Sequence, residues 1–509
     1  MGECGMIVSL PIVFFILLAV SVLSSLFLIS PKVPLHFVRI HIGINSLPQV
    51  VALVALVSDH GGVSLGPWRF DNLTWLLALF VLIVGLIAQR YSVHYLLGDK
   101  NYRKYFALLT ITTAADSLTW LSNDLRLLLF FWGVTLLGLT LLIGLKKEWQ
   151  VARNAAGVTG RIFAISWIIL VFVIIWVTQV TGHWQLSQVL SQNSLAQFAT
   201  WEKTSINLLF ILSVIIPAAQ WPFQRWLLDS VVAPTPISAV MHAGIVNAGG
   251  MMLTRFAPFF NGDSAQYVLL VISSLSVLIG TGIMLVQVDY KRQLVGSTIA
   301  QMGFMLIQCA LGAYLAAIIH AVLHGLFKST LFLQSGSAIR QHETNLEKIK
   351  QTLNIWTISG VIFSGMVAIG YWLSSHGEAY QMISSVALGW SVFLAWTQLV
   401  ATGNGHIARM AGFSIFAGAA LLYTMIHSVF YKLLEKTIHT GIQPPTFAAI
   451  LLVLVLLMIS ILGAWFSRNR TSTTFAIIYL WFVRVGEPHQ NLIESHPKYL
   501  TQILYRGGK

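Results

Sequence analysis

The sequence contains little charge for its length. Lys, Arg, Asp and Glu together make up 9% of its 509 residues, whereas an ordinary soluble chain carries about 25%. Hydrophobic residues make up 56% of the chain, and its mean hydropathy is +0.77. These values exclude a soluble globular protein and predict a polytopic membrane protein.

Cysteine is almost absent as well. Cys4 and Cys309 are the two cysteines, and their wide separation excludes a disulfide framework and a C-x-x-C motif. The sequence has no plausible Cys/His arrangement for zinc either. We therefore expect free apolar thiols, and neither a metal nor a cofactor in this chain.

The hydrophobic residues gather into about 15 apolar stretches, each near the 20 residues that a helix needs to cross a bilayer. The first follows Glu3 with no preceding basic residue and no small-residue cleavage site, which predicts a retained span and not a signal peptide. The stretches predict an all-α protein with transmembrane helices near residues 6–30, 37–58, 73–98, 103–122, 124–145, 161–181, 205–226, 236–260, 266–287, 293–311, 313–338, 354–373, 381–400, 408–431 and 447–466.

The net charge of +13 comes from basic residues that cluster in every second connection between these stretches. Because cytoplasmic loops are enriched in Lys and Arg, this alternation predicts an external N-terminus and a cytoplasmic C-terminus, and it argues against a nucleic-acid partner. The longest cytoplasmic loop would be the basic segment 146–160, and the longest external loop would be 182–204. The clusters are Lys32 and Arg39; Lys100, Arg103 and Lys104; Lys146, Lys147 and Arg153; Lys291 and Arg292; and Arg340, Lys348 and Lys350.

Three ionisable residues recur at four-residue intervals in stretch 313–338, namely His320, His324 and Lys328. Each step of four residues drifts by about 40° around a helix, so the three side chains form one stripe about 12 Å long. Ionisable groups at membrane depth are costly and often mark ion paths. Histidine titrates near neutral pH, so the stripe predicts a proton relay. The alternative is structural, because membrane histidines also form hydrogen bonds between helices and lysines extend toward the interface.

Proline interrupts stretch 205–226 at Pro217 and Pro222. A proline inside a helix removes a backbone hydrogen bond and kinks or breaks the helix, and broken helices recur at transporter binding sites. We predict a broken helix here, with His242 beside it as a second station of the relay. A kink without function is the alternative.

Acidic residues are scarce around stretch 124–145. Asp116 and Asp124 are the carboxylates near its start. We expect both to be solvated in a loop, although either could supply a carboxylate to that helix.

Three blocks of sequence resemble the proton-translocating, antiporter-like membrane subunits of respiratory complex I and of Mrp-type Na⁺/H⁺ antiporters. The first block is Q-W-P-F-Q-R-W-L from Gln220, followed by P-T-P-I-S-A-V-M-H-A. The second is K-R-Q-L-V-G-S-T-I-A-Q-M-G-F from Lys291, and the third is the H-x-x-x-H-x-x-x-K run from His320. Their order and spacing also match.

This resemblance implies two inverted five-helix repeats, each with a broken helix, and a proton path through buried lysines and histidines. His242, Lys291, His320, His324 and Lys328 fall on family positions of that path, although Lys291 is also well placed as a basic topology anchor. The implied organisation is N-terminal helices over 1–102, a first repeat over 103–260, a second repeat over 261–431, and a last transmembrane helix with a cytoplasmic tail over 432–509.

Some family positions are not preserved. The family has glutamate after the tryptophan of span five, where this chain has Trp132 and Gly133, and it has a lysine where this chain has Pro217. The stretch 381–400, which corresponds to the second broken helix, lacks both proline and lysine. These departures argue against a redox-linked subunit of complex I.

The run H-A-G-I-V-N-A-G-G-M-M-L-T-R-F-A-P from His242 to Pro258 is similar to the DabB (MpsA) family, membrane subunits of inorganic-carbon-concentrating complexes. That resemblance implies a bacterial inner-membrane subunit that is not itself an enzyme. It would conduct protons and couple the proton-motive force to a DabA-like cytoplasmic zinc subunit, which resembles a carbonic anhydrase and converts CO₂ to bicarbonate. The alternatives are an Mrp-like cation/proton antiporter subunit and a non-conducting membrane anchor for a cytoplasmic enzyme.

Overall fold

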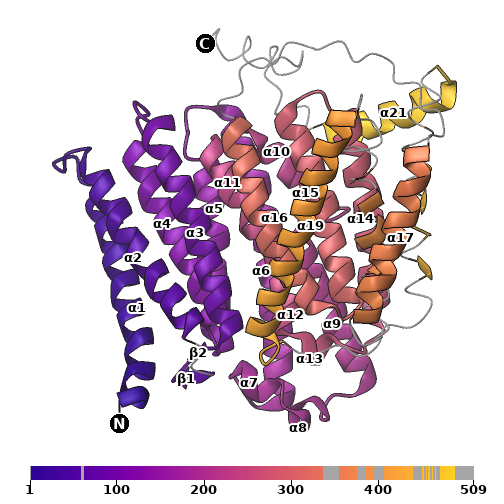
Figure 1. Cartoon of the computed structure of the whole chain (residues 1–509). Helices are drawn as coiled ribbons and strands as arrows, with labels where there is room; N and C mark the ends of the chain where they lie inside the picture. The colour runs from indigo at the N-terminus through magenta and orange to yellow at the C-terminus, as the bar shows by residue number, and fades with distance from the viewer. Residues whose placement is uncertain are drawn as a thin grey trace.

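Long helices that run roughly alongside one another make up most of the computed structural model of the chain (Figure 1). The structure describes residues 2–58, 62–335, 355–374, 406–438 and 471–487, with short pieces between 385 and 396 and between 450 and 465. Within these residues, eight helical segments are long and apolar enough to cross a membrane. The predicted multi-pass, all-α architecture is confirmed. Much of the predicted spans 381–400 and 447–466 lies outside the described residues.

The N-terminal helices follow the predicted apolar stretches closely. A short antiparallel hairpin separates the first two helices from the next three, and aspartate side chains cap two of those helices, Asp71 at α3 and Asp124 at α5. The elements are α1 (Gly2–Phe27), α2 (Phe37–Val57), β1 (Val63–Leu65), β2 (Trp68–Phe70), α3 (Asn72–Tyr95), α4 (Tyr102–Leu121) and α5 (Leu125–Ile143).

The prediction that residues 146–160 form a loop is wrong for most of this segment. Helix α6 (Gln150–Thr181) already begins at Gln150 and continues for 32 residues. The segment after Trp149 contains no proline and several alanines, which favour a helix even where the sequence is polar. The segment 182–204, which was predicted to be external, contains two short helices, α7 (Leu186–Val189) and α8 (Gln192–Leu195), before α9 (Thr200–Ile215) begins.

Two consecutive helical segments are interrupted in the middle of the bundle. After α9, the chain leaves the helical path and returns through α10 (Arg225–Asp229) and η1 (Ser230–Val232). The next segment is divided into α11 (Thr235–Ala243), η2 (Ile245–Asn247), α12 (Ala248–Arg255) and α13 (Ala257–Phe260). Three uninterrupted helices follow, namely α14 (Ala265–Val286), α15 (Tyr290–Ala310) and α16 (Tyr314–Ser335).

The last described helices cover one side of the bundle. They are α17 (Ile355–Ser374), α19 (His406–Leu434) and α21 (Thr473–Gly486). Helix α21 lies across the end of the bundle and not along it (Figure 1). Its Phe482 ring packs on α14, where Gly282 leaves room that a Cβ atom would fill. Helix α21 thus contacts the bundle through Phe482.

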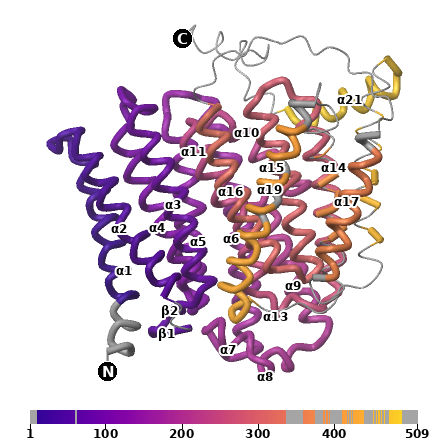
Figure 2. The backbone as a smooth tube through the Cα atoms, in the orientation of Figure 1, coloured from indigo at the N-terminus to yellow at the C-terminus, as the bar shows by residue number. Residues whose placement is uncertain are grey.

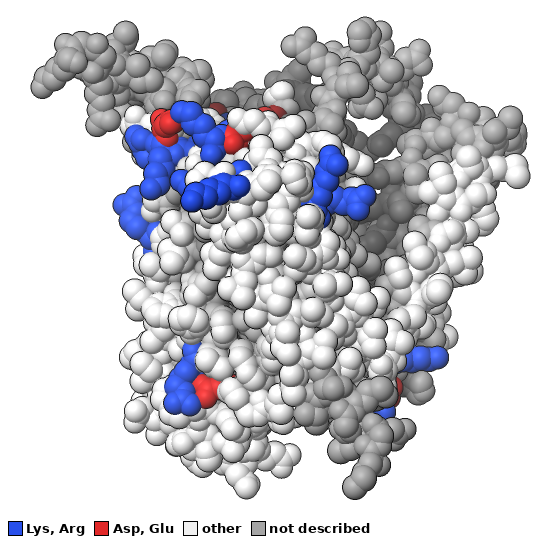
Figure 3. Space-filling view, turned by 90° about the vertical axis from the view of Figure 1, so that its left-hand side faces the viewer, with Lys and Arg blue, Asp and Glu red and all other residues white. Residues whose placement is uncertain are grey.

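Ion pairs and hydrogen bonds identify which loops share an end of the bundle. Lys100 pairs with Glu148 at 3.2 Å, and Lys146 pairs with Asp99 at 3.1 Å, so the loops after α3 and α5 lie together. At the opposite end, Asp124 forms a β-bridge with Gln185. In the face drawn in Figure 3, most of the Lys and Arg side chains gather toward one end, and a broad band of uncharged side chains separates them from smaller charged groups near the other end. This distribution is typical of a protein that spans a bilayer.

Helix α16 occupies the interior of the arrangement, as the backbone trace in Figure 2 illustrates. It packs against α3, α11, α12 and α15. Gly325 permits the closest of these approaches, because a Cβ atom there would lie 2.3 Å from Cζ of Phe80 and 2.5 Å from the carbonyl oxygen of Ala243. The helix with the predicted ionisable stripe is therefore enclosed by protein on several sides.

Candidate proton path

The predicted stripe on α16 is buried. His324 is 6% exposed and Lys328 is 1% exposed, while His320 is partly buried. The imidazole rings of His320 and His324 lie 6.0 Å apart, centre to centre, at an angle of 72°. The four-residue spacing has therefore placed both rings and the lysine side chain along one face of α16, inside the bundle.

Each end of the stripe has a polar contact on α15. Nδ1 of His320 lies 3.1 Å from Oε1 of Gln308, and Nζ of Lys328 donates to the carbonyl oxygen of Leu294 at 3.1 Å. His324, between them, is different, because neither of its ring nitrogens has a hydrogen-bond partner among the described residues. Since buried polar groups are normally paired with protein or water, His324 has the capacity to bind water or a proton from either neighbour.

His242 lies at the Lys328 end of the stripe. Its ring stacks on Phe332, one helical turn beyond Lys328, with centroids 4.1 Å apart and an angle of 16°. The residue is completely buried, and neither ring nitrogen has a partner within the described part of the chain. His242 and Lys328 are within electrostatic reach of one another, so the predicted second station is adjacent to the first.

The helical backbone is interrupted twice near His242, once before α11 and once immediately after it. Helix α9 ends at Ile215, just before Pro217, and Ala219 has a positive φ of 52°. The predicted break is therefore confirmed. A second break begins at Gly244, immediately after α11 ends. Asn247 there donates from Nδ2 to the carbonyl oxygen of Ala243 at 2.5 Å, which satisfies one backbone group that the break releases.

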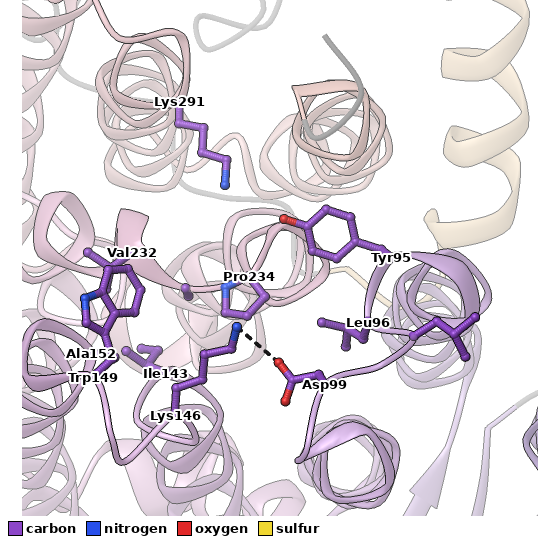
Figure 4. Close-up of a pocket in the computed structure, with 12 residues that line it drawn as sticks. Tyr95, Leu96, Asp99, Ile143, Lys146, Trp149, Ala152, Val232, Pro234 and Lys291 are labelled. Atoms are coloured by element: carbon purple, nitrogen blue, oxygen red, sulfur yellow. Dashed lines mark ion pairs between the residues drawn. The ribbon is translucent and has the colours of Figure 1, made fainter. Parts of the chain in front are cut away.

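Lys291 lies where the stripe approaches the surface. It lies in the first turn of α15, about one turn before Leu294, and its side chain lines a pocket of about 430 Å³. Figure 4 shows Lys291 and Lys146 on either side of Pro234, with Lys146 paired to Asp99. Lys291 takes part in no ion pair recorded for the described residues. The pocket thus connects the basic end of the bundle with the start of α11.

All five predicted residues therefore lie in one region, but their role in proton transfer remains a prediction. Sequence reasoning missed Gln308, the carbonyl of Leu294, the second break and Gly325. The glycines at 244, 249 and 250 were a usable signal for the break. The contacts of Gln308 and Leu294 had no signal, because they depend on how α15 packs beside α16.

Two positions that depart from the family pattern have structural explanations. A Cβ atom at Gly133 would lie 2.8 Å from Nε1 of Trp167, so the indole of Trp167 occupies the space that a glutamate side chain would need. That indole also donates to the carbonyl oxygen of Leu129 at 2.9 Å. Pro217 lies within the break itself and not in a helix. The stretch 381–400, which corresponds to the family's second broken helix, lies mostly outside the described residues.

Comparison with known families agrees with this fold. The profile of the family described as NADH:quinone oxidoreductase/Mrp antiporter, TM matches residues 122–408, which is more than half of the chain. The chain belongs to this family. A second profile, described as NADH-ubiquinone oxidoreductase (complex I), chain 5 N-terminus, matches residues 66–106 of this antiporter-like chain.

Relatives place the chain more narrowly within the antiporter-like family. It is 56% identical to the probable inorganic carbon transporter subunit DabB of Bacillus subtilis (strain 168), over 97% of this chain and 98% of that protein. It is 54% identical to the protein of the same name from Bacillus anthracis, over 97% of both chains. The chain is therefore a member of the DabB group of inorganic carbon transporter subunits.

Solved structures with low sequence identity share the fold. A chain of the Mrp complex from Dietzia sp. DQ12-45-1b aligns with a TM-score of 0.63 and 20% identity, over 94% of this chain and 59% of that chain. A chain of the membrane-bound sulfane sulfur reductase, an archaeal respiratory membrane complex, aligns with a TM-score of 0.60 and 16% identity, over 94% of this chain and 99% of its own length. The antiporter-like fold thus extends over nearly the whole chain.

Proposed function

We propose that this DabB-type subunit conducts protons and couples the proton-motive force to a cytoplasmic, DabA-like zinc subunit that hydrates CO₂. The observation that carries the proposal is the buried line of His320, His324 and Lys328, with His242 beside its end. A membrane subunit without ion transport has no need for four buried ionisable groups, which are expensive at this depth.

Proton transfer along the line would use groups with spare hydrogen-bonding capacity. The ring nitrogens of His324 and His242 have no hydrogen-bond partner among the residues that the structure describes, so each ring can accept a proton on one nitrogen and release one from the other. Lys328 can exchange a proton as well, which arginine cannot do in a protein. Lys291 and its pocket would connect this line to the cytoplasmic end.

The zinc chemistry is assigned to the partner. A zinc ion in that partner would activate water for addition to CO₂ at neutral pH, and net hydration of CO₂ to bicarbonate would release one proton. A proton path in the attached membrane subunit supplies a physical link between this step and the proton-motive force. This chain would orient and move protons and would not bind the metal.

A second candidate is a cation/proton antiporter subunit, which the fold likeness to the Mrp complex favours. The two functions differ in their need for a partner. We expect that the chain alone will not restore growth in air to a carbonic-anhydrase-deficient strain that requires high CO₂. Co-expression with the zinc subunit encoded for it should restore growth, with bicarbonate uptake that an uncoupler abolishes.

Three outcomes would contradict the proposal. Rescue by this chain alone would remove the need for a zinc partner. Rescue only of sodium-sensitive cells would favour the antiporter. Uptake that persists in the presence of an uncoupler would favour a membrane anchor without proton conduction.

A further inference from the structure

Asp116 is buried inside a helix, contrary to the loop position expected for it. It lies in α4, more than one turn from either end, and is 5% exposed. Among the residues that the structure describes, no other Asp or Glu lies so far inside a helix of membrane-spanning length. Burying an ionised carboxylate without a partner costs several kcal/mol, on the order of what would unfold a small domain.

The charge of an ionised Asp116 would not be compensated. Within the described part of the chain, its Oδ1 atom has no hydrogen-bond partner, and the side-chain donor beside it is the neutral indole of Trp120. The cations at this end of α4 are occupied elsewhere. Arg255 donates to the backbone carbonyls of Thr119, Trp120 and Ser122. Arg69 pairs with Asp71 and Arg126 pairs with Asp124, each at 2.7 Å.

Among the described residues of α2, α3 and α5, no titratable group is a charge partner of Asp116. His41, on α2, already lies within hydrogen-bond distance of Ser24 and Thr110 through its two ring nitrogens, at 2.7 and 3.0 Å. On α3, the ionisable residues Arg90, Tyr91, His94 and Tyr95 lie toward the end of the helix that packs near the start of α4. On α5, Arg126 is the charged residue, and it belongs to the pair with Asp124.

Helix register places Asp116 between α4 and α5. Thr112, one turn before it, approaches Gly138 so closely that a Cβ atom there would lie 2.2 Å from its hydroxyl oxygen. Trp120, one turn after it, lies 6.4 Å from Trp132, ring centre to ring centre. Residues at four-residue intervals share a helix face, so Asp116 lies against the part of α5 between Trp132 and Gly138.

We infer that Asp116 is a proton-binding site within the membrane, separate from the line on α16. Its carboxylate takes up one proton to become a neutral carboxylic acid, and it releases that proton to return to the carboxylate. The neutral form resolves the uncompensated burial, and the free oxygen provides the atom for proton exchange. Its participation in transport rests on the proposed function, whereas proton binding does not.

Labelling with dicyclohexylcarbodiimide tests the proton directly. This apolar reagent adds to protonated carboxyl groups and leaves a stable acylurea that mass spectrometry locates. In membranes that contain the full chain with its partner, Asp116 should be labelled at neutral pH, where an ordinary aspartate with a pKa of about 3.9 is ionised. Asp124 is the internal control, because the hydrogen bond from Arg126 holds the pKa of its carboxyl below the usual range, and it should not react.

Substitutions separate proton binding from transport. Asp116→Asn mimics the neutral acid, so the complex should assemble with an unchanged melting temperature but lose energised bicarbonate uptake. Asp116→Glu should keep both labelling and part of the uptake, and Asp124→Asn should keep uptake. If the proposed function fails in the co-expression test while Asp116 is labelled, the proton-binding site still stands.

Three results would overturn the proton-binding site. One is an unlabelled Asp116 at neutral pH, and another is a large loss of thermal stability in Asp116→Asn, which would reveal an ionised, paired carboxylate. Suppression of labelling by Na⁺ would reassign the site to a metal cation. Normal uptake by the Asp116→Asn complex would remove the residue from the transport path.

Discussion

Lys328 is the residue at which the relay can be tested most sharply. It is buried and donates a hydrogen bond to the backbone carbonyl of Leu294, and it lies between His324 and His242. Lys328→Ala should reduce energised bicarbonate uptake by about 10²-fold or more, which is the contribution typical of a positioned proton donor or acceptor. Lys328→Arg should fail as well, because a guanidinium retains its proton.

The control for this substitution is Lys203→Ala, at the start of α9 and away from the stripe. It should leave uptake unchanged. Uptake is measured in intact cells with and without an uncoupler, and a pull-down of the partner checks assembly. A purely structural lysine would give a different pattern, in which arginine restores uptake or alanine prevents assembly. Uptake close to that of the wild type in Lys328→Ala would exclude this residue from the relay.

The four-residue spacing of His320, His324 and Lys328 was enough to predict that these side chains form one part of the site. The geometry of an α-helix determines that residues 320, 324 and 328 share a face, whatever surrounds them. Their surroundings are determined by other helices, so the contacts with Gln308 and Leu294 could not be anticipated. Asp116 shows the same limitation, because its position in the chain suggested the end of a span while packing against α5 buries it.

At the scale of the elements, the close contact at Gly325 holds α16 against α3 and α11. An added Cβ atom would lie 2.3 Å from Phe80 and 2.5 Å from a backbone oxygen. Gly325→Ala should therefore lower stability by about 1–3 kcal/mol, as overpacked cores do, and should reduce uptake by separating His324 and Lys328 from His242. The melting midpoint of the purified protein in detergent measures the first effect.

Gly157→Ala on α6 is the matched control, because it is also a helical glycine but has nothing within 4 Å of the added atom. It should change stability by less than about 1 kcal/mol, in the favourable direction. Equal behaviour of the two variants would contradict the tight packing of α16. A Gly325→Ala protein with normal stability but no uptake would assign this glycine to motion and not to packing.

The two interrupted helical segments differ in how clearly the sequence marks them. Proline at 217 would remove a backbone hydrogen bond from a helix, and α9 ends two residues before it. The break at Gly244 follows from contacts, because glycine and asparagine permit a break without requiring one. Helix α6 is the converse case. Its polar, basic start predicted a loop, yet local helix propensity and packing extend the helix to Gln150.

At the scale of the whole molecule, the apolar stretches before residue 338 predicted the helices well, since length and hydropathy determine what can cross a bilayer. Sequence alone could not show how α21 contacts α14, because that contact joins residues about 200 positions apart in the chain, at Gly282 and Phe482. The direction in which the bundle crosses the membrane depends on charge and not on packing. The structure identifies which loops share an end, and the basic clusters predict which end is cytoplasmic.

Cysteine labelling provides a test of this orientation. Glu148 is exposed beside Lys100 at the basic end, and Gln192 is exposed on α8 at the opposite end. With Glu148→Cys, a membrane-impermeant maleimide should react only after the cells are opened, because cytoplasmic loops carry the excess of Lys and Arg. With Gln192→Cys, it should react in intact cells.

Both cysteine substitutions are made in a chain in which serine replaces Cys4. Cys309 can remain, because it is buried. Because ion pairs join the loops at residues 99–100 and 146–148, one label at each end establishes the direction of the whole helical bundle. Reaction of Gln192→Cys only from the cytoplasmic side would reverse the orientation. It would then place Lys291 and its pocket on the external face, out of reach of any cytoplasmic zinc subunit, and the coupling proposed here would fail with it.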